Sequence, residues 1–112
     1  MRRVVLAFAV VAALGVALLG SARADEPVFE ITIKDHRFEP EETVVPAGEK
    51  VKLVIKNLDA TPEEFESYDL NREKVVNGNG EITVFIGPLD PGTYGYFGEF
   101  NPDTAQGRIV AR

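Results

Sequence analysis

Residues 92–110, with the sequence GTYGYFGEFNPDTAQGRIV, decide the fold of this chain. Residues 93–97 are rich in the aromatic and β-branched side chains that strands prefer, and residues 108–110 predict a second strand. About nine residues join the two strands, and this loop carries oxygen donors such as Glu99 and Asn101. Because binding residues often lie on loops held by a rigid scaffold, we expect this loop to belong to the functional site of a β-domain.

The first residues predict a secretory signal peptide. Arg2 and Arg3 precede an apolar run of sixteen residues, 4–19, and an Ala-Arg-Ala sequence then ends at Ala24. This pattern is typical of a cleaved leader, and the run is shorter than the about 20 residues that a membrane span needs. We therefore expect a signal peptide over residues 1–24, a domain over residues 25–112, export to the periplasm, and no membrane insertion after cleavage; the alternative is an uncleaved anchor.

Composition limits both the core and the partners of the predicted domain. The chain contains no Cys, and Met1 is its only Met, so disulfides cannot compensate for the small core expected of such a domain. The leader holds three of the 12 basic residues and none of the 18 acidic ones, which leaves a net charge of −9 on the rest. Nucleic acids and anionic lipids require cationic patches, so neither is an expected partner. Cations or a basic protein remain candidates, although acidity also serves solubility.

Alternation of apolar and polar residues predicts strands throughout the domain. Residues 28–33, 51–55 and 81–86 each place β-branched or apolar side chains on one face and polar ones on the other. Shorter strands are expected at residues 43–45 and 65–68, with a break at 35–40 and a turn at 77–80, whereas residues 70–76 fit either a helical turn or a strand. We expect an all-β, antiparallel Greek-key sandwich of seven or eight strands.

Several motifs occur in an order that resembles the cupredoxin fold. They are F-x-P at Phe38 and Pro40, VPAGEKV at residues 45–51, Thr61-Pro62, PGTYGY at 91–96 and GRIV at 107–110. TPEEFESYDLNREKVV at 61–76 and YFGEFNPDTAQG at 96–107 are more similar to the cupredoxin-like domains of bacterial periplasmic iron uptake, of the EfeO and FtrB kind. This resemblance implies a metal-handling protein that works with periplasmic or inner-membrane iron-transport components.

The resemblance also shows which copper ligands are missing. In a cupredoxin, the positions of Glu63, Gly98 and Asn101 hold His, Cys and His, and a thioether follows near residues 104–106. A type 1 copper site needs a thiolate and two imidazoles. The absence of any Cys therefore excludes type 1 copper and the electron transfer that depends on it.

Oxygen donors near the same loop predict a site for a harder metal. Carboxylates bind hard cations, and iron accepts carboxylates mixed with imidazole. We expect an iron or copper ion to be held by some of five residues, with no type 1 copper: His36, Glu63, Glu66, Glu99 and Asn101. One limit comes from strand geometry, because Glu64 and Glu66 share a face while Glu63 takes the other.

Two further hypotheses stay open. A metal-free interaction module would present residues 58–68 and 98–106 to a periplasmic or membrane transport partner. Adjacent acids after a Pro are also common at solvated loop edges, and a single His is often a surface residue. A ferroxidase-type activity is a third option, and it would need a redox metal that no ligand set in the sequence demonstrates. A hydrolase is not expected, because the absence of Cys excludes a Cys-His pair and the single His lies in no Ser-His-Asp pattern.

Overall fold

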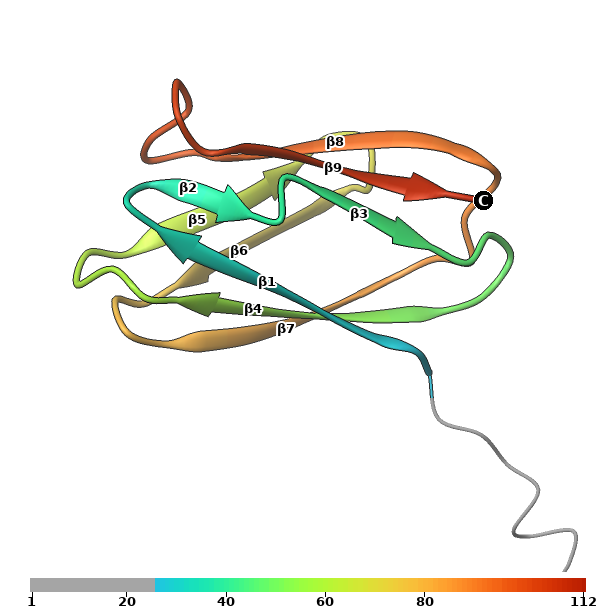
Figure 1. Ribbon diagram of the computed structural model, residues 1–112, viewed down its shortest axis with the longest axis horizontal. Coiled ribbons are helices and arrows are strands. Elements are labelled where there is room, and N and C mark those ends of the chain that lie inside the picture. The colour runs from blue at the N-terminus through green and yellow to red at the C-terminus, as the bar shows by residue number, and fades with distance from the viewer. Residues whose placement is uncertain (1–25) are drawn as a thin grey trace, which may run out of the picture.

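The computed structural model describes residues 26–112, which form two β-sheets packed face to face (Figure 1). The predicted signal peptide lies outside the described residues. Within these residues there are nine strands, one or two more than predicted, and no helix is long and apolar enough to cross a membrane. The strands are β1 (Val28–Lys34), β2 (Arg37–Glu39), β3 (Glu42–Val45), β4 (Val51–Asn57), β5 (Glu63–Ser67), β6 (Arg72–Val76), β7 (Glu81–Ile86), β8 (Gly92–Gly98) and β9 (Gln106–Ala111).

The order of strands confirms a β-sandwich and corrects the expectation of purely antiparallel pairing. One sheet has the order β2-β1-β4-β7 and the other the order β3-β9-β8-β5-β6. β1 pairs with β4 in parallel, and so does β3 with β9. Parallel neighbours need a crossover rather than a tight hairpin. For β1 and β4 the crossover runs through β3, because the chain passes into the second sheet at β3 before it returns to the first as β4 (Figure 1).

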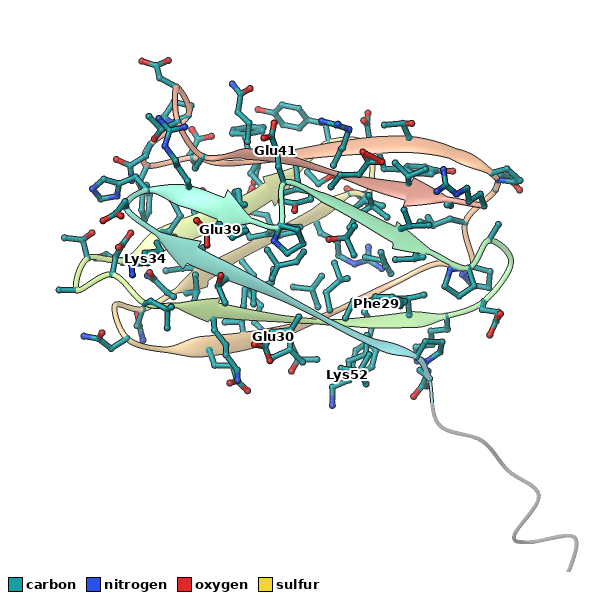
Figure 2. The ribbon with its side chains drawn as sticks, in the orientation of Figure 1. Phe29, Glu30, Lys34, Glu39, Glu41 and Lys52 are labelled. Atoms are coloured by element: carbon teal, nitrogen blue, oxygen red, sulfur yellow. The ribbon has the colours of Figure 1, made fainter. Side chains whose placement is uncertain are left out.

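Alternating residues fill the space between the sheets, as the sequence predicts. Ile31, Leu53 and Val84 are buried, and their alternation along β1, β4 and β7 directs the polar residues between them outward. Figure 2 shows Lys52 of β4 pointing away from the sandwich. An aromatic cluster of three rings, with centroid separations of 4.9 to 6.3 Å, joins the two sheets: Phe38, Phe65 and Tyr96.

The extra strand β2 follows from a two-residue hairpin turn at a place where the sequence pattern predicts a break. Asp35 and His36 both have positive φ, at 53° and 58°, and β1 and β2 pair on either side of them. Two such residues in succession form the hairpin turn that normally favours Asn-Gly. The carboxylate of Asp59 stabilises it by accepting the backbone N–H groups of Asp35 and His36 at 2.8 and 2.9 Å.

β6 resolves the ambiguous residues 70–76 as a strand at the edge of the five-stranded sheet. Arg72 Nε and Lys74 Nζ donate to the carbonyls of Phe85 and Thr83 on β7, the edge of the other sheet. Long basic side chains thus cover the open edge of the sandwich, where unpaired backbone groups would otherwise invite association. Alternation places Glu73 on the opposite, outward side of β6.

Candidate functional site

Glu63 begins β5 at the point where this strand passes the loop between β8 and β9. Its side chain is only 1% exposed. Its Oε1 accepts the backbone N–H groups of Glu64 at 3.0 Å and Phe100 at 2.8 Å, while Oε2 accepts Nδ2–H of Asn101 at 2.8 Å. Hydrogen bonds to an ionised group are the stronger kind, and three of them compensate for burial of this carboxylate. Glu63 therefore fastens β5 to the loop.

Gly98 at the end of β8 lies directly against the Glu63 carboxylate. A Cβ at Gly98 would lie 2.5 Å from Cδ of Glu63 and 2.7 Å from Cβ of Ala105, which is closer than atoms can pack. The loop is closed by backbone bonds from Gly98 N to Ala105 O at 2.8 Å and from Ala105 N to Asn101 O at 2.9 Å. We call Glu63, Gly98 and Asn101 the corner.

The corner does not fit the type 1 copper site of the cupredoxins that the chain resembles. A thiolate at Gly98 would need the volume that the Glu63 carboxylate fills. The oxygens of Glu63 already accept three N–H groups, one of them from Nδ2 of Asn101, so the loop itself satisfies this carboxylate. The carboxylate occupies the region where cupredoxins gather their copper ligands, and it links the loop to β5 without a metal.

His36 lies in the β1–β2 turn, where its polar contacts among residues 26–112 are with Asp59. Besides its backbone N–H, its Nδ1 lies 3.6 Å from Oδ2 of Asp59. Backbone hydrogen bonds, first from His36 and then from Asp35, lower the pKa of Asp59 against the opposing effect of burial. The positive φ of His36 and its contacts give it a structural role in the turn.

Three carboxylates gather on the outward face of the five-stranded sheet. Glu64 and Glu66 alternate along β5, and Glu66 pairs with Glu73 of the neighbouring β6. One carboxylate oxygen of each lies within 4.8 Å of the others. Glu64, Glu66 and Glu73 are the carboxylate cluster below.

Glu66 is the unusual member of the carboxylate cluster. It is 8% exposed, and its Oε2 is buried with no hydrogen-bond partner among the described residues. Burial, followed by contact with Glu73, raises its pKa, and burial followed by the charge of Glu73 raises that of Glu64. Glu99 adds to both shifts, and its backbone N–H donates to Glu64 O at 2.9 Å, so it lies beside the cluster.

The five predicted ligands therefore fall into three places. Glu63 and Asn101 meet in the corner, Glu66 and Glu99 lie at the outward face, and His36 contacts Asp59. Their assignment as ligands stays a prediction.

Two residues of the carboxylate cluster were not among the predicted ligands. Glu64 was recognised as sharing a face with Glu66, and that alternation was the signal that could have included it. Glu73 was missed because residues 70–76 were ambiguous, although the alternation of Arg72, Glu73 and Lys74 indicates an edge strand with one acid outward.

Solved structures of copper proteins have the same fold. Auracyanin A of Chloroflexus aurantiacus matches with a TM-score of 0.67 at 19% identity, over 79% of this chain and 100% of its own. The metal binding domain of the Cu(I)-exporting P-type ATPase CopA of Streptococcus pneumoniae matches with a TM-score of 0.68 at 8% identity, over 80% and 91%. Amicyanin of Paracoccus versutus matches with a TM-score of 0.58 at 18% identity, over 80% and 84%. At such identities the likeness shows the fold alone.

Sequence comparison identifies the family. An uncharacterized protein of Rickettsia prowazekii is 47% identical over 93 residues, which are 81% of this chain and 74% of that protein. The family model described as a cupredoxin-like domain matches residues 5–111. This chain therefore belongs to the cupredoxin-like domain family.

Proposed function

We propose that this chain is an exported metal-handling protein that binds a hard divalent cation at the carboxylate cluster. The observation that carries the proposal is the buried Oε2 of Glu66, which has no hydrogen-bond partner within residues 26–112. A buried carboxylate without partners is costly unless it is neutralised. A cation beside Glu66, Glu64 and Glu73 would remove that cost.

The donor set favours a hard cation over a soft one. Carboxylate oxygens suit Ca²⁺, Mg²⁺, Mn²⁺ and Fe²⁺, whereas Cu(I) prefers thiolates and thioethers. Oxygens within 4.8 Å of one another can converge on one ion. Glu66 belongs both to this set and to the ligands predicted from the sequence, and the nearby charge of Glu99 also acts on Glu66.

Iron is the cation that we propose the protein handles in the cell. The support is the resemblance of residues 61–76 and 96–107 to the domains of periplasmic iron uptake. The predicted leader supports a periplasmic location, and the same resemblance supports transport components of the inner membrane as partners. The proposed role is uptake or transfer of iron, with no type 1 copper and no enzymatic activity.

Calorimetric titration of the metal-free protein, purified after export, tests the cation site. Fe²⁺ under anaerobic conditions and Mn²⁺ should bind saturably, and Glu66→Gln should weaken binding by about tenfold or more, because it removes a charged ligand at the centre of the cluster. Glu49→Gln changes an exposed acid in a distant loop by the same chemistry and should bind like the wild type. Failure of both ions to bind more tightly than millimolar would overturn the proposal.

The same experiment separates the carboxylate cluster from the predicted ligands in the corner and the β1–β2 turn. His36→Ala should leave the affinity unchanged, since His36 contacts Asp59 rather than the cluster. A loss of affinity in His36→Ala, together with wild-type binding by Glu66→Gln, would show that the cation binds at His36 and the corner rather than at the carboxylate cluster.

A further inference from the structure

An exposed aromatic pair lies beside the carboxylate cluster on the outward face. Tyr68, just after β5, is 76% exposed and lies over Phe97 of β8, with ring centroids 5.6 Å apart and planes at 56°. Phe97 pairs with Glu66 across the two strands, so the pair is adjacent to the cluster. Tyrosine is enriched at interfaces because its ring is apolar and its hydroxyl is polar, so this aromatic pair beside the carboxylates is a candidate surface for a partner.

Two hollows flank Tyr68. One, of about 370 Å³, is lined by Tyr68, Phe97, Asp69, Gly95, Gln106 and Gly107. The other, of about 300 Å³, is lined by Glu66 and Glu73 together with Tyr68, Ser67, Asn71 and Arg72. Tyr68 therefore stands between a hollow with an aromatic wall and one with carboxylates at its side.

Gly95 lines the first hollow and has no side chain that would occupy it. A Cβ at this position would meet only Oδ2 of Asp69, at 3.7 Å, which is ordinary van der Waals contact. Its φ is not in the left-handed region, so a residue with a Cβ could adopt this backbone conformation without strain. Neither packing nor backbone conformation requires glycine here, which leaves the space itself as the feature that glycine provides.

The chemistry of this face fits a guanidinium group. Arginine stacks on aromatic faces and pairs with carboxylates through a planar fork, which a compact ammonium group does not do. The cationic residue already present, Arg72, donates to the carbonyls of Phe85, Leu70 and Asn71 and so leaves the carboxylates of Glu66 and Glu73 available. The net charge of −6 on the chain favours encounter with a basic partner.

We propose that Tyr68, Phe97 and Gly95 form a docking surface for an arginine-bearing extended segment of a partner protein. The guanidinium stacks on Tyr68 and pairs with Glu66 and Glu73, while the neighbouring part of the segment fills the hollow over Gly95. This docking goes beyond the proposed cation site and shares Glu66 with it. Where both occur, arginine and the cation compete, so docking of a partner promotes release of the ion.

The docking surface can be tested with a capped pentapeptide of alternating glycine and arginine, labelled for fluorescence anisotropy. The metal-free protein should bind it saturably at low ionic strength. The analogue with citrulline, which keeps the shape of arginine without its charge, and the analogue with lysine should each bind about tenfold more weakly. Equal binding of the arginine and citrulline peptides, or no binding of the arginine peptide, would overturn the proposal.

Variants locate the bound peptide on the surface. Tyr68→Ala removes the stacking face, and Gly95→Val fills the hollow, so each should weaken arginine-peptide binding by about tenfold while the fold, judged by thermal melting, is kept. Phe100→Ala is the matched control, because Phe100 is 51% exposed on the neighbouring loop and should not matter. Wild-type affinity in both Tyr68→Ala and Gly95→Val would contradict the proposed surface.

The two proposals fail separately. Tyr68→Ala should bind Mn²⁺ like the wild type, whereas Glu66→Gln should lose affinity for both Mn²⁺ and peptide. Saturating Mn²⁺ should weaken peptide binding in the wild type. Peptide binding without Mn²⁺ binding would overturn only the cation site, and Mn²⁺ binding without peptide binding would overturn only the docking surface.

Discussion

Glu63 and Glu66 lie three residues apart on β5, on opposite faces of the same sheet, and both are buried. Glu63 faces the loop between β8 and β9 and accepts three N–H groups. Glu66 faces outward, is surrounded by other carboxylates, and keeps one oxygen without a partner among the described residues. The difference shows that two buried carboxylates on one strand can differ in how fully hydrogen bonds satisfy them.

This contrast separates the structural role of Glu63 from the binding role that we propose for Glu66 on the same strand. In the corner, the carboxylate of Glu63 replaces what a metal does in a copper protein, since it holds the loop against β5. At the outward face, Glu66 is costly to the protein without a ligand, and a cation or a guanidinium would relieve that cost.

Glu63→Ala should produce the largest effect. The change leaves the N–H of Phe100 and the amide of Asn101 unpaired in a partly buried site and opens a cavity, which should cost on the order of 2–5 kcal/mol of the free energy of unfolding. Urea denaturation measures it. Asp103→Ala, an exposed acid in the same loop, should stay within about 0.5 kcal/mol of the wild type. Equal stability of the two variants would mean that the corner does not hold the loop.

Gly98→Ala should have the next largest effect. The added methyl group collides with Cδ of Glu63 and Cβ of Ala105, and overpacking of this kind costs about 1–3 kcal/mol. Combining it with Glu63→Ala should give less than the sum of the two single effects, because the shortest of these contacts is then gone. Strict additivity in a double-mutant cycle by urea denaturation would show that Gly98 is glycine for another reason.

Local sequence patterns predicted the strands but not the contacts that define the two sites. The alternation along β1, β4 and β7 depends only on side-chain period, so residues 28–33, 51–55 and 81–86 were placed correctly. The β1–β2 hairpin was missed because the residue that stabilises it, Asp59, lies 23 and 24 residues further along the chain. No local pattern contains that information.

The candidate sites show the same limit. The order of the cupredoxin-like motifs predicted that Glu63 lies near the loop. The two-residue period of a strand predicted that Glu63 and Glu66 lie on opposite faces. The amide of Asn101 that satisfies Glu63 is 38 residues away, and Glu73 joins the carboxylate cluster only through the register of β5 with β6. Register depends on the whole sheet, so it could not be derived from either segment alone.

The smallest effect should appear in the pH dependence of stability, and it belongs to Glu66. Its pKa is raised from the ordinary 4.5 by burial and then by Glu73, so the folded protein holds this proton more tightly than the unfolded chain does. The resulting stabilisation is complete below pH 4.5 and is lost as pH rises through the raised pKa. Glu66→Gln cannot lose a proton there. In the presence of a chelator, the urea midpoint of Glu66→Gln should therefore rise relative to that of the wild type as the pH increases from 4 to 7.

Glu49→Gln provides the control for this experiment, since it removes an exposed acid elsewhere. The difference between its urea midpoint and that of the wild type should stay constant from pH 4 to pH 7. Mn²⁺ should reverse the order at pH 7, because the wild type then gains the free energy of binding and Glu66→Gln does not. A difference between Glu66→Gln and the wild type that stays constant from pH 4 to pH 7 would show that Glu66 ionises as freely as a surface acid. The distinction between the satisfied carboxylate of the corner and the unsatisfied one of the outward face would then be lost.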